Sequence, residues 1–127
     1  MRARLRVAIA GLGAVGLKLA VELNRGIDGL ELAAVSARDR AAAAARLADR
    51  GVSAPVVEIE ALEPLADIVV ECAPAALLDA IATPFLRNGK TVVVLSAGAL
   101  LTRMHLVDLA RSTGGQIVVP TGALIGL

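Results

Sequence analysis

Apolar positions along the chain fall into two alternating kinds of segment. Short runs of Val, Ile, Leu and Ala alternate with longer segments in which apolar residues return every three or four positions. The first pattern is typical of buried parallel strands, and the second of helices with one apolar face. The pattern predicts six strands, over residues 5–10, 30–35, 55–59, 68–71, 91–95 and 116–119.

Most of the segments between these strands have helical spacing. The pattern predicts helices over residues 14–25, 40–50, about 75–86 and 102–111. Gly26 suits the end of the first helix, and Asp39 is placed to cap the start of the second. Pro84 is expected to bend the third helix or to end it early. Residues 60–66 are too few for a full crossover helix, but they can cross to the next strand with one helical turn.

The alternation of strands and helices predicts an α/β domain with a parallel sheet. Its two halves of three strands each match a doubly wound, Rossmann-type sheet with the order 3-2-1-4-5-6 and helices on both faces. The length of 127 residues fits one domain. Hydrophobic residues make up 57% and aromatic residues only 1%, so the core must be built from Ala, Val, Leu and Ile.

Charge, hydropathy and cysteine content bear on the partners and the cellular location to be expected for the protein. The net charge is +1, and no basic cluster is paired with aromatic residues, so nucleic acid is not an expected partner. No apolar run reaches the ~18 residues of a membrane span. The basic start and the apolar run over 7–17 imitate a signal peptide, but three glycines and Lys18 interrupt the pattern. With a single cysteine, we expect a cytoplasmic protein without a disulfide framework.

The first predicted strand leads into a glycine motif of the form G-x-G-x-x-G. Such a motif between a strand and a helix is typical of dinucleotide binding. Its first glycine permits a tight turn, its second lets a diphosphate approach the backbone, and its third allows close helix packing. We predict cofactor contacts from Gly11, Gly13, Ala14, Val15 and Gly16. The alternative is a glycine-rich turn that binds nothing.

The carboxyl ends of the other predicted strands also carry small or polar residues. Ligands of open α/β sheets bind outside these ends, although small and polar residues are common in any loop. Further predicted cofactor contacts are Ser36, Arg38, Cys72, Ala73, Pro74, Ser96, Ala97, Gly98, Gly122 and Ala123.

The end of the second strand bears on the choice of cofactor. NAD sites usually carry Asp or Glu there, which binds the ribose 2′-hydroxyl. Here Ser36 takes that place and Arg38 follows. A hydroxyl and a guanidinium can bind a 2′-phosphate, so the cofactor is NAD or NADP, with a lean toward tolerance of NADP. Arg38 could equally stack on adenine or remain solvated.

No residue is assigned a catalytic role, and no metal-ligating cluster is found. Cys72 has no cation nearby in the sequence, so we expect it to line the site rather than to act as a nucleophile. His105 falls inside a predicted helix, away from the strand ends. Glu71 ends a buried strand and must find partners that the sequence does not name.

Three segments resemble the L-aspartate dehydrogenase family, namely 70–74 (VECAP), 89–100 (GKTVVVLSAGAL) and 119–127 (VPTGALIGL). The resemblance runs the whole length of the chain. It implies oxidation of L-aspartate with NAD or NADP to iminoaspartate, which yields oxaloacetate and ammonia or feeds NAD biosynthesis. It also implies that Ala123 lies at the nicotinamide end of the cofactor.

Members of that family are longer than this chain. Their second domain supplies the catalytic histidine, most of the aspartate pocket and much of a dimer interface, and His105 does not match the catalytic position. The resemblance therefore implies that residues 1–127 form the NAD(P)-binding domain alone, which is inactive by itself. It also implies that the full-length protein is a homodimer. Two alternatives remain: the cofactor domain of a homoserine-dehydrogenase-like or dihydrodipicolinate-reductase-like oxidoreductase, or a non-catalytic dinucleotide-sensing module.

Overall fold

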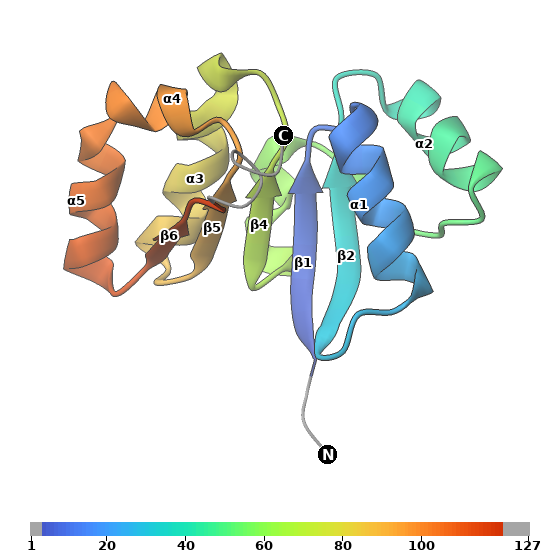
Figure 1. Ribbon diagram of the computed structural model, residues 1–127, viewed down its shortest axis with the longest axis horizontal. Coiled ribbons are helices and arrows are strands. Elements are labelled where there is room, and N and C mark those ends of the chain that lie inside the picture. Colours follow the sequence, from blue (N-terminus) through green and yellow to red (C-terminus); the bar gives the residue numbers. More distant parts are fainter. Residues whose placement is uncertain (1–3, 121–127) are drawn as a thin grey trace.

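The computed structural model describes residues 4–120, and these contain one parallel sheet of six strands (Figure 1). The sheet has the order β3-β2-β1-β4-β5-β6, which confirms the predicted doubly wound topology. The strands are β1 (Leu5–Ala10), β2 (Leu30–Ser36), β3 (Val56–Val57), β4 (Ile68–Glu71), β5 (Thr91–Val94) and β6 (Gln116–Val118).

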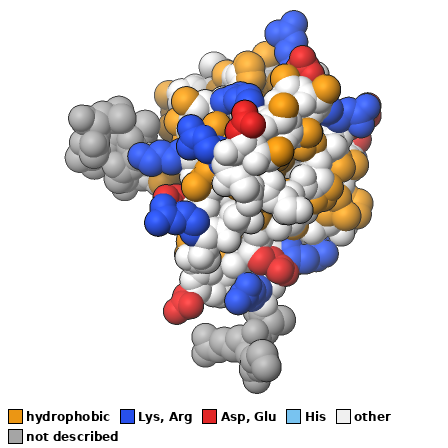
Figure 2. Space-filling model, turned by 90° about the vertical axis from the view of Figure 1, so that its right-hand side faces the viewer, with side chains coloured by type: hydrophobic (Ala, Val, Ile, Leu, Met, Phe, Trp, Pro, Cys, Tyr) orange, Lys and Arg blue, Asp and Glu red, His pale blue; other side chains and the backbone are white. Residues whose placement is uncertain are grey.

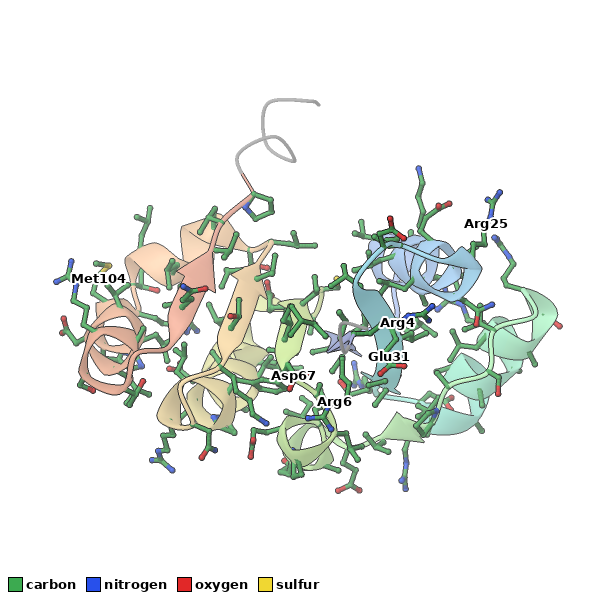
Figure 3. The ribbon with its side chains drawn as sticks, turned by 90° about the horizontal axis from the view of Figure 1, so that it is seen from below. Arg4, Arg6, Arg25, Glu31, Asp67 and Met104 are labelled. Atoms are coloured by element: carbon green, nitrogen blue, oxygen red, sulfur yellow. The ribbon has the colours of Figure 1, made fainter. Side chains whose placement is uncertain are left out.

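Helices cover both faces of the sheet. One face carries α1 (Ala14–Arg25) and α2 (Arg40–Asp49). The other carries the short 3₁₀ segments η1 (Ile59–Ala61) and η2 (Glu63–Leu65), followed by α3 (Leu78–Arg87) and α5 (Met104–Thr113). In the view along the strands, α1 lies on one side of the sheet and the 3₁₀ segments with α3 on the other (Figure 3).

The central strand β1 contributes side chains to the hydrophobic core on both faces of the sheet. Val7 and Ile9 pack into the cluster beneath α1 and α2, whereas Ala8 and Ala10 pack into the cluster beneath α3 and α5. This follows from the two-residue period of a strand, which sends successive side chains to opposite faces. Alanines on the second face leave room for the ring of Phe85, which is fully buried there.

Some predicted boundaries were wrong. β3 has two residues instead of five, because the chain turns into η1 at Ile59. The third helix begins with the 3₁₀ turn η3 (Ala75–Leu77) and is not ended by Pro84, because buried Phe85 and Leu86 anchor its last turn. Asn88 also helps to hold that end, since its side-chain amide donates to the Pro84 carbonyl (3.0 Å).

The segment after β5 also differs from the prediction. Residues predicted as an exit loop form the short helix α4 (Ala97–Leu101), which precedes α5. The Ala- and Leu-rich composition of this segment favours a helix. Within residues 4–120 no helix is long and apolar enough to cross a membrane.

Candidate cofactor site

The glycine motif forms a tight loop that is tied to the two strands beside β1. The Gly11 N–H donates to the Ser36 carbonyl at the end of β2 (2.9 Å). Gly11 has a φ of +100°, and a Cβ there would lie 2.7 Å from the carbonyl oxygen of Cys72, which follows β4. A side chain at position 11 would thus be strained and would also clash. The loop is therefore held against the ends of β2 and β4.

The second glycine of the motif faces open space. A Cβ on Gly13 would meet no atom within 4 Å. Gly13 precedes α1 and contributes no side-chain cap, and no acidic residue occupies the first turn of the helix. The first amides of a helix have no partner within the helix, and they carry its positive dipole end. Open space beside unpaired amides fits the diphosphate of a dinucleotide.

A cleft of about 790 Å³ opens at this edge of the sheet, at the carboxyl ends of β1, β2 and β4. It brings together seven of the predicted residues: Gly11, Gly13, Ser36, Arg38, Cys72, Ala73 and Pro74. The lining does not include Ala14, Val15, Gly16, Ser96, Ala97 or Gly98. Gly122 and Ala123 lie outside the described residues.

Third in the motif, Gly16 is a packing residue in this structure. A Cβ there would lie 2.1 Å from the Gly11 carbonyl oxygen, so only glycine lets α1 approach the loop. Ser96 is likewise engaged within the protein, because its hydroxyl donates to Oε2 of Glu71 (2.8 Å). Neither residue lines the cleft, and each makes its contacts with residues next to it.

The cleft also contains residues that the sequence reasoning missed, among them Asp39, Arg46, Glu58 and Glu60. Glu58 and Glu60 follow β3, whose carboxyl end lies at the same edge of the sheet as that of β2. The predicted strand order could have located them. Arg46 comes from α2, and its Nη1 donates to the Leu12 carbonyl (2.6 Å). Nothing in the local sequence indicates that contact.

Ser36, Arg38 and Asp39 form the wall of the cleft at the end of β2. Ser36 is 3% exposed and Arg38 is exposed. Asp39 caps α2 as predicted, because its Oδ1 accepts from the Ala42 N–H (3.0 Å). One oxygen of this carboxylate is therefore already engaged in holding the helix.

Cys72 lines the cleft as a neutral thiol. Burial raises the pKa of Cys72 to about 11, and the nearby charge of Glu71 acts in the same direction. A nucleophilic cysteine needs the opposite, a lowered pKa beside a cation. The geometry and the pKa both support the lining role.

Glu71 is fully buried and finds its partners on the segment after β5. Its Oε1 accepts from the Leu95 N–H (3.1 Å) and the Ser96 N–H (2.9 Å), while Oε2 accepts from the Ser96 hydroxyl. A buried carboxylate is stable only when it is hydrogen-bonded in this way. Glu71 therefore joins the end of β4 to the end of β5, beside the cleft.

His105 lies away from the cleft and pairs with Asp79 between α5 and α3. Arg103 also donates to Asp79 (2.9 Å). These hydrogen bonds lower the pKa of Asp79, and the bond from His105 has the largest effect. Among the described residues, no group of three or more His, Cys, Asp or Glu could hold a metal ion.

The domain that contains this cleft is similar to a known family of NAD-binding domains. Residues 11–120 match the family described as "Homoserine dehydrogenase, NAD binding domain". The chain belongs to this NAD-binding domain family. Its membership confirms the predicted class of cofactor, a nicotinamide dinucleotide.

Relatives of this NAD-binding domain include enzymes named L-aspartate dehydrogenase. It is 54% identical to one from Bradyrhizobium diazoefficiens, over 97% of this chain and 44% of the relative. It is 51% identical to L-aspartate dehydrogenase 3 of Bordetella bronchiseptica, over 99% of this chain and 47% of the relative. These identities confirm the resemblance to that family. The chain spans about half the length of the curated relatives that it matches.

Solved structures share the fold of the domain. Myo-inositol dehydrogenase from Lactobacillus casei, in complex with NAD(H) and myo-inositol, has a TM-score of 0.78 at 24% identity, over 92% of this chain and 36% of that chain. Biliverdin reductase from Synechocystis sp. PCC 6803, in complex with biliverdin and NADP+, has a TM-score of 0.71 at 27% identity, over 91% of this chain and 37% of that chain.

Proposed function

We propose that residues 1–127 are the NAD(P)-binding domain of an L-aspartate dehydrogenase. The observation that carries the proposal is the glycine loop, whose open Gly13 and unpaired α1 amides border the 790 Å³ cleft. The two relatives named L-aspartate dehydrogenase support the choice of substrate. When bound, the cofactor would supply the hydride acceptor for the oxidation of L-aspartate, which loses a hydride from its α carbon and a proton from its amino group to become iminoaspartate.

The residues of this chain bind and orient the cofactor in that scheme. The amides at the start of α1 and the backbone at Gly13 hold the diphosphate. Ser36 and Arg38 receive the adenine ribose, with or without a 2′-phosphate. Ala73 and Pro74 line the cleft beside the neutral thiol of Cys72, which carries no charge to repel the phosphates. The groups of the acid/base step and the aspartate pocket lie outside these residues.

The finer predictions belong to the same proposal. Arg38 and Ser36 support use of NADP as well as NAD, whereas the carboxylates of Glu58 and Glu60 in the cleft act against a 2′-phosphate. The resemblance to L-aspartate dehydrogenases supports a place in NAD biosynthesis, a cytoplasmic location and a homodimeric whole protein. We further propose that Ala14, Val15, Ala97, Gly98, Gly122 and Ala123 contact the diphosphate and nicotinamide parts of the cofactor.

A chimeric enzyme tests the proposal. The 127-residue chain is fused, after its last residue, to the part of the Bradyrhizobium diazoefficiens relative that its alignment leaves uncovered. We expect the chimera to oxidise L-aspartate with NAD or NADP, whereas the chain alone binds both cofactors without ordinary turnover. The difference is expected because acid–base catalysis alone contributes ~10²–10⁴-fold and the substrate pocket would be absent too.

The name of the matched family makes homoserine the second substrate to assay. Turnover of L-aspartate but not homoserine by the chimera supports the proposal. Turnover at an ordinary enzyme rate by the 127-residue chain alone would contradict the division into two parts. A chain that binds neither NADH nor NADPH in calorimetry would contradict the cofactor site itself.

A further inference from the structure

We propose that Arg46 positions the phosphate-binding loop, residues 11–13, and places a fixed positive charge beside the cofactor's diphosphate. The proposal rests on the function proposed above. Arg46 lies in the last turn of α2, 34 residues from Leu12 in sequence. Its guanidinium nevertheless donates to the Leu12 carbonyl at 2.6 Å. A charged donor at so short a distance makes one of the stronger hydrogen bonds in proteins.

The bond acts on the peptide group between Leu12 and Gly13, whose N–H belongs to the proposed diphosphate site. Leu12 stands between two glycines, the residues that lose the most conformational freedom on folding. The side chain of Leu12 is buried. Without the Arg46 hydrogen bond, however, the Leu12 carbonyl would be free to rotate with the loop. In a trans peptide the carbonyl and the following N–H point in opposite directions. Holding the Leu12 carbonyl toward α2 therefore fixes the direction of the Gly13 N–H.

Arg46 also brings its charge to the cleft. It lines both the 790 Å³ cleft and a second hollow of about 560 Å³ between α1 and α2. Lys18, Arg25 and Arg50 line the second hollow as well. Figure 2, which views the molecule from the side of α1 and α2, shows Lys and Arg side chains spread over this face. Of the four cations that line the second hollow, only Arg46 also lines the cleft and binds the glycine loop.

The other guanidinium N–H groups of Arg46 make no hydrogen bond with residues 4–120. A guanidinium is always charged and offers five N–H donors. One donor holds the loop, and the others stay available to the phosphates. Because NADH and NADPH share the diphosphate, Arg46 serves both cofactors alike. This separates its role from that of Arg38, which is expected to read the 2′-position.

Binding by three variants tests the inference. In Arg46→Met, we expect the dissociation constants of NADH and NADPH to rise together, each by about tenfold, as loss of a charged hydrogen bond implies. Arg46→Lys should recover most of the affinity, because lysine keeps the positive charge and can still donate a hydrogen bond. Arg50→Met is the matched control: it lies one turn further along the chain in the same hollow, and its side chain makes no polar contact among residues 4–120. It should change affinity by less than about twofold.

The amide spectrum of the free protein supplies a second readout. Loss of the Arg46 bond should shift the Gly13 and Ala14 amide signals while signals from β4 and β5 stay in place. A general loss of folding would move all of them. Parental affinity in Arg46→Met, or an equal loss in Arg50→Met, would overturn the inference while leaving the proposed function intact. A parent chain that binds neither cofactor would overturn both.

Discussion

Two glycines of one motif, Gly13 and Gly16, have opposite structural requirements, although only two residues separate them. Gly13 has extended backbone angles, with φ −81° and ψ −162°, and open space where a Cβ would be. Gly16 has the Gly11 carbonyl oxygen 2.1 Å from that position. The motif therefore combines one glycine that leaves room for a ligand with another that permits helix packing.

Substitution should separate these two roles. Gly13→Val is expected to abolish binding of NADH and NADPH, because its side chain would fill the space of the diphosphate. It should cost about 1 kcal/mol or less of stability, because the backbone angles are allowed for any residue. Gly16→Ala should instead destabilise the fold by about 1–3 kcal/mol or more, since backbone must move. Calorimetry and thermal unfolding measure the two effects, and parental binding by Gly13→Val would place the diphosphate elsewhere.

Arg38 is the residue expected to distinguish NADPH from NADH. A charged hydrogen bond to a 2′-phosphate contributes ~1.5–3 kcal/mol, or roughly 10- to 100-fold in affinity. Arg38→Ala should therefore weaken NADPH binding much more than NADH binding. Ser36→Asp should reverse any preference for NADPH, because it adds a ribose acceptor that repels phosphate.

Dissociation constants for both cofactors check this expectation. If Arg38 only stacks on adenine, which both cofactors contain, Arg38→Ala would weaken the two equally. Arg46→Met is the internal comparison, because it should weaken both by the same factor. A parallel loss in Arg38→Ala would therefore refute its role at the 2′-position.

At the scale of elements, Glu71 joins the end of β4, which is followed by residues of the cleft, to the end of β5. Its carboxylate accepts from two amides and a hydroxyl on the segment after β5. Glu71→Ala would leave those part-buried donors without partners and should cost about 1–3 kcal/mol of unfolding free energy. Glu71→Gln should cost less, because the amide oxygen still accepts. Chemical unfolding measures both, and Glu60→Gln, an exposed carboxylate at the same edge, serves as the control. Equal stability of Glu71→Ala and parent would show that the contact contributes nothing.

Elements with a strong local pattern could be predicted from the sequence. The apolar run of β1, the glycine motif and the Asp39 cap are each complete within a few residues. They were therefore predicted, together with the strand order that the alternation of elements implies. The helix α4 was missed, because Ser-Ala-Gly at its start is equally typical of a loop.

The remaining parts of the site depend on contacts between distant segments. Arg46 meets Leu12 across 34 residues, and Glu71 meets Ser96 across 25. Neither pair has a local signature in the sequence. The first depends on how α2 packs on α1, and the second on how β4 pairs with β5. The edge of the sheet at which the cleft lies could thus be predicted from the sequence, whereas these contacts between distant segments could not.

Across the whole molecule, ion pairs of two aspartates join elements that are distant in the sequence. Arg6 in β1 binds Asp67, which precedes β4, through its backbone N–H (2.8 Å) and its guanidinium (3.1 and 3.3 Å). Figure 3, which views the molecule from below, shows Arg6 and Asp67 close to each other near the middle of the sheet. The Arg6 hydrogen bonds lower the pKa of Asp67. Asp79, bound by His105 and Arg103, also has a lowered pKa, and it joins α3 to α5.

The lowered pKa values predict how stability depends on pH. In the unfolded chain each carboxyl takes up its proton near the ordinary pKa of 3.8, and in the folded chain only at lower pH. The unfolded state therefore binds more protons as pH falls below that value, so these pairs stabilise the fold fully above it and progressively less through the lower folded pKa. We expect the melting temperature to fall steeply below about pH 4.

Asp67→Asn isolates one of these contributions. At neutral pH it should lower the melting temperature by about 4 °C, because the ion pair is lost while the packing is unchanged. In acid the parent carboxyl is itself protonated, so the melting temperatures of parent and variant should converge as pH falls below 3.8 and through the lower pKa of the folded state. Asp28→Asn is the control, since Asp28 is exposed and its side chain makes no polar contact among residues 4–120. Two curves that stay parallel down to acid pH would show that the effect of the substitution does not depend on the charge of Asp67.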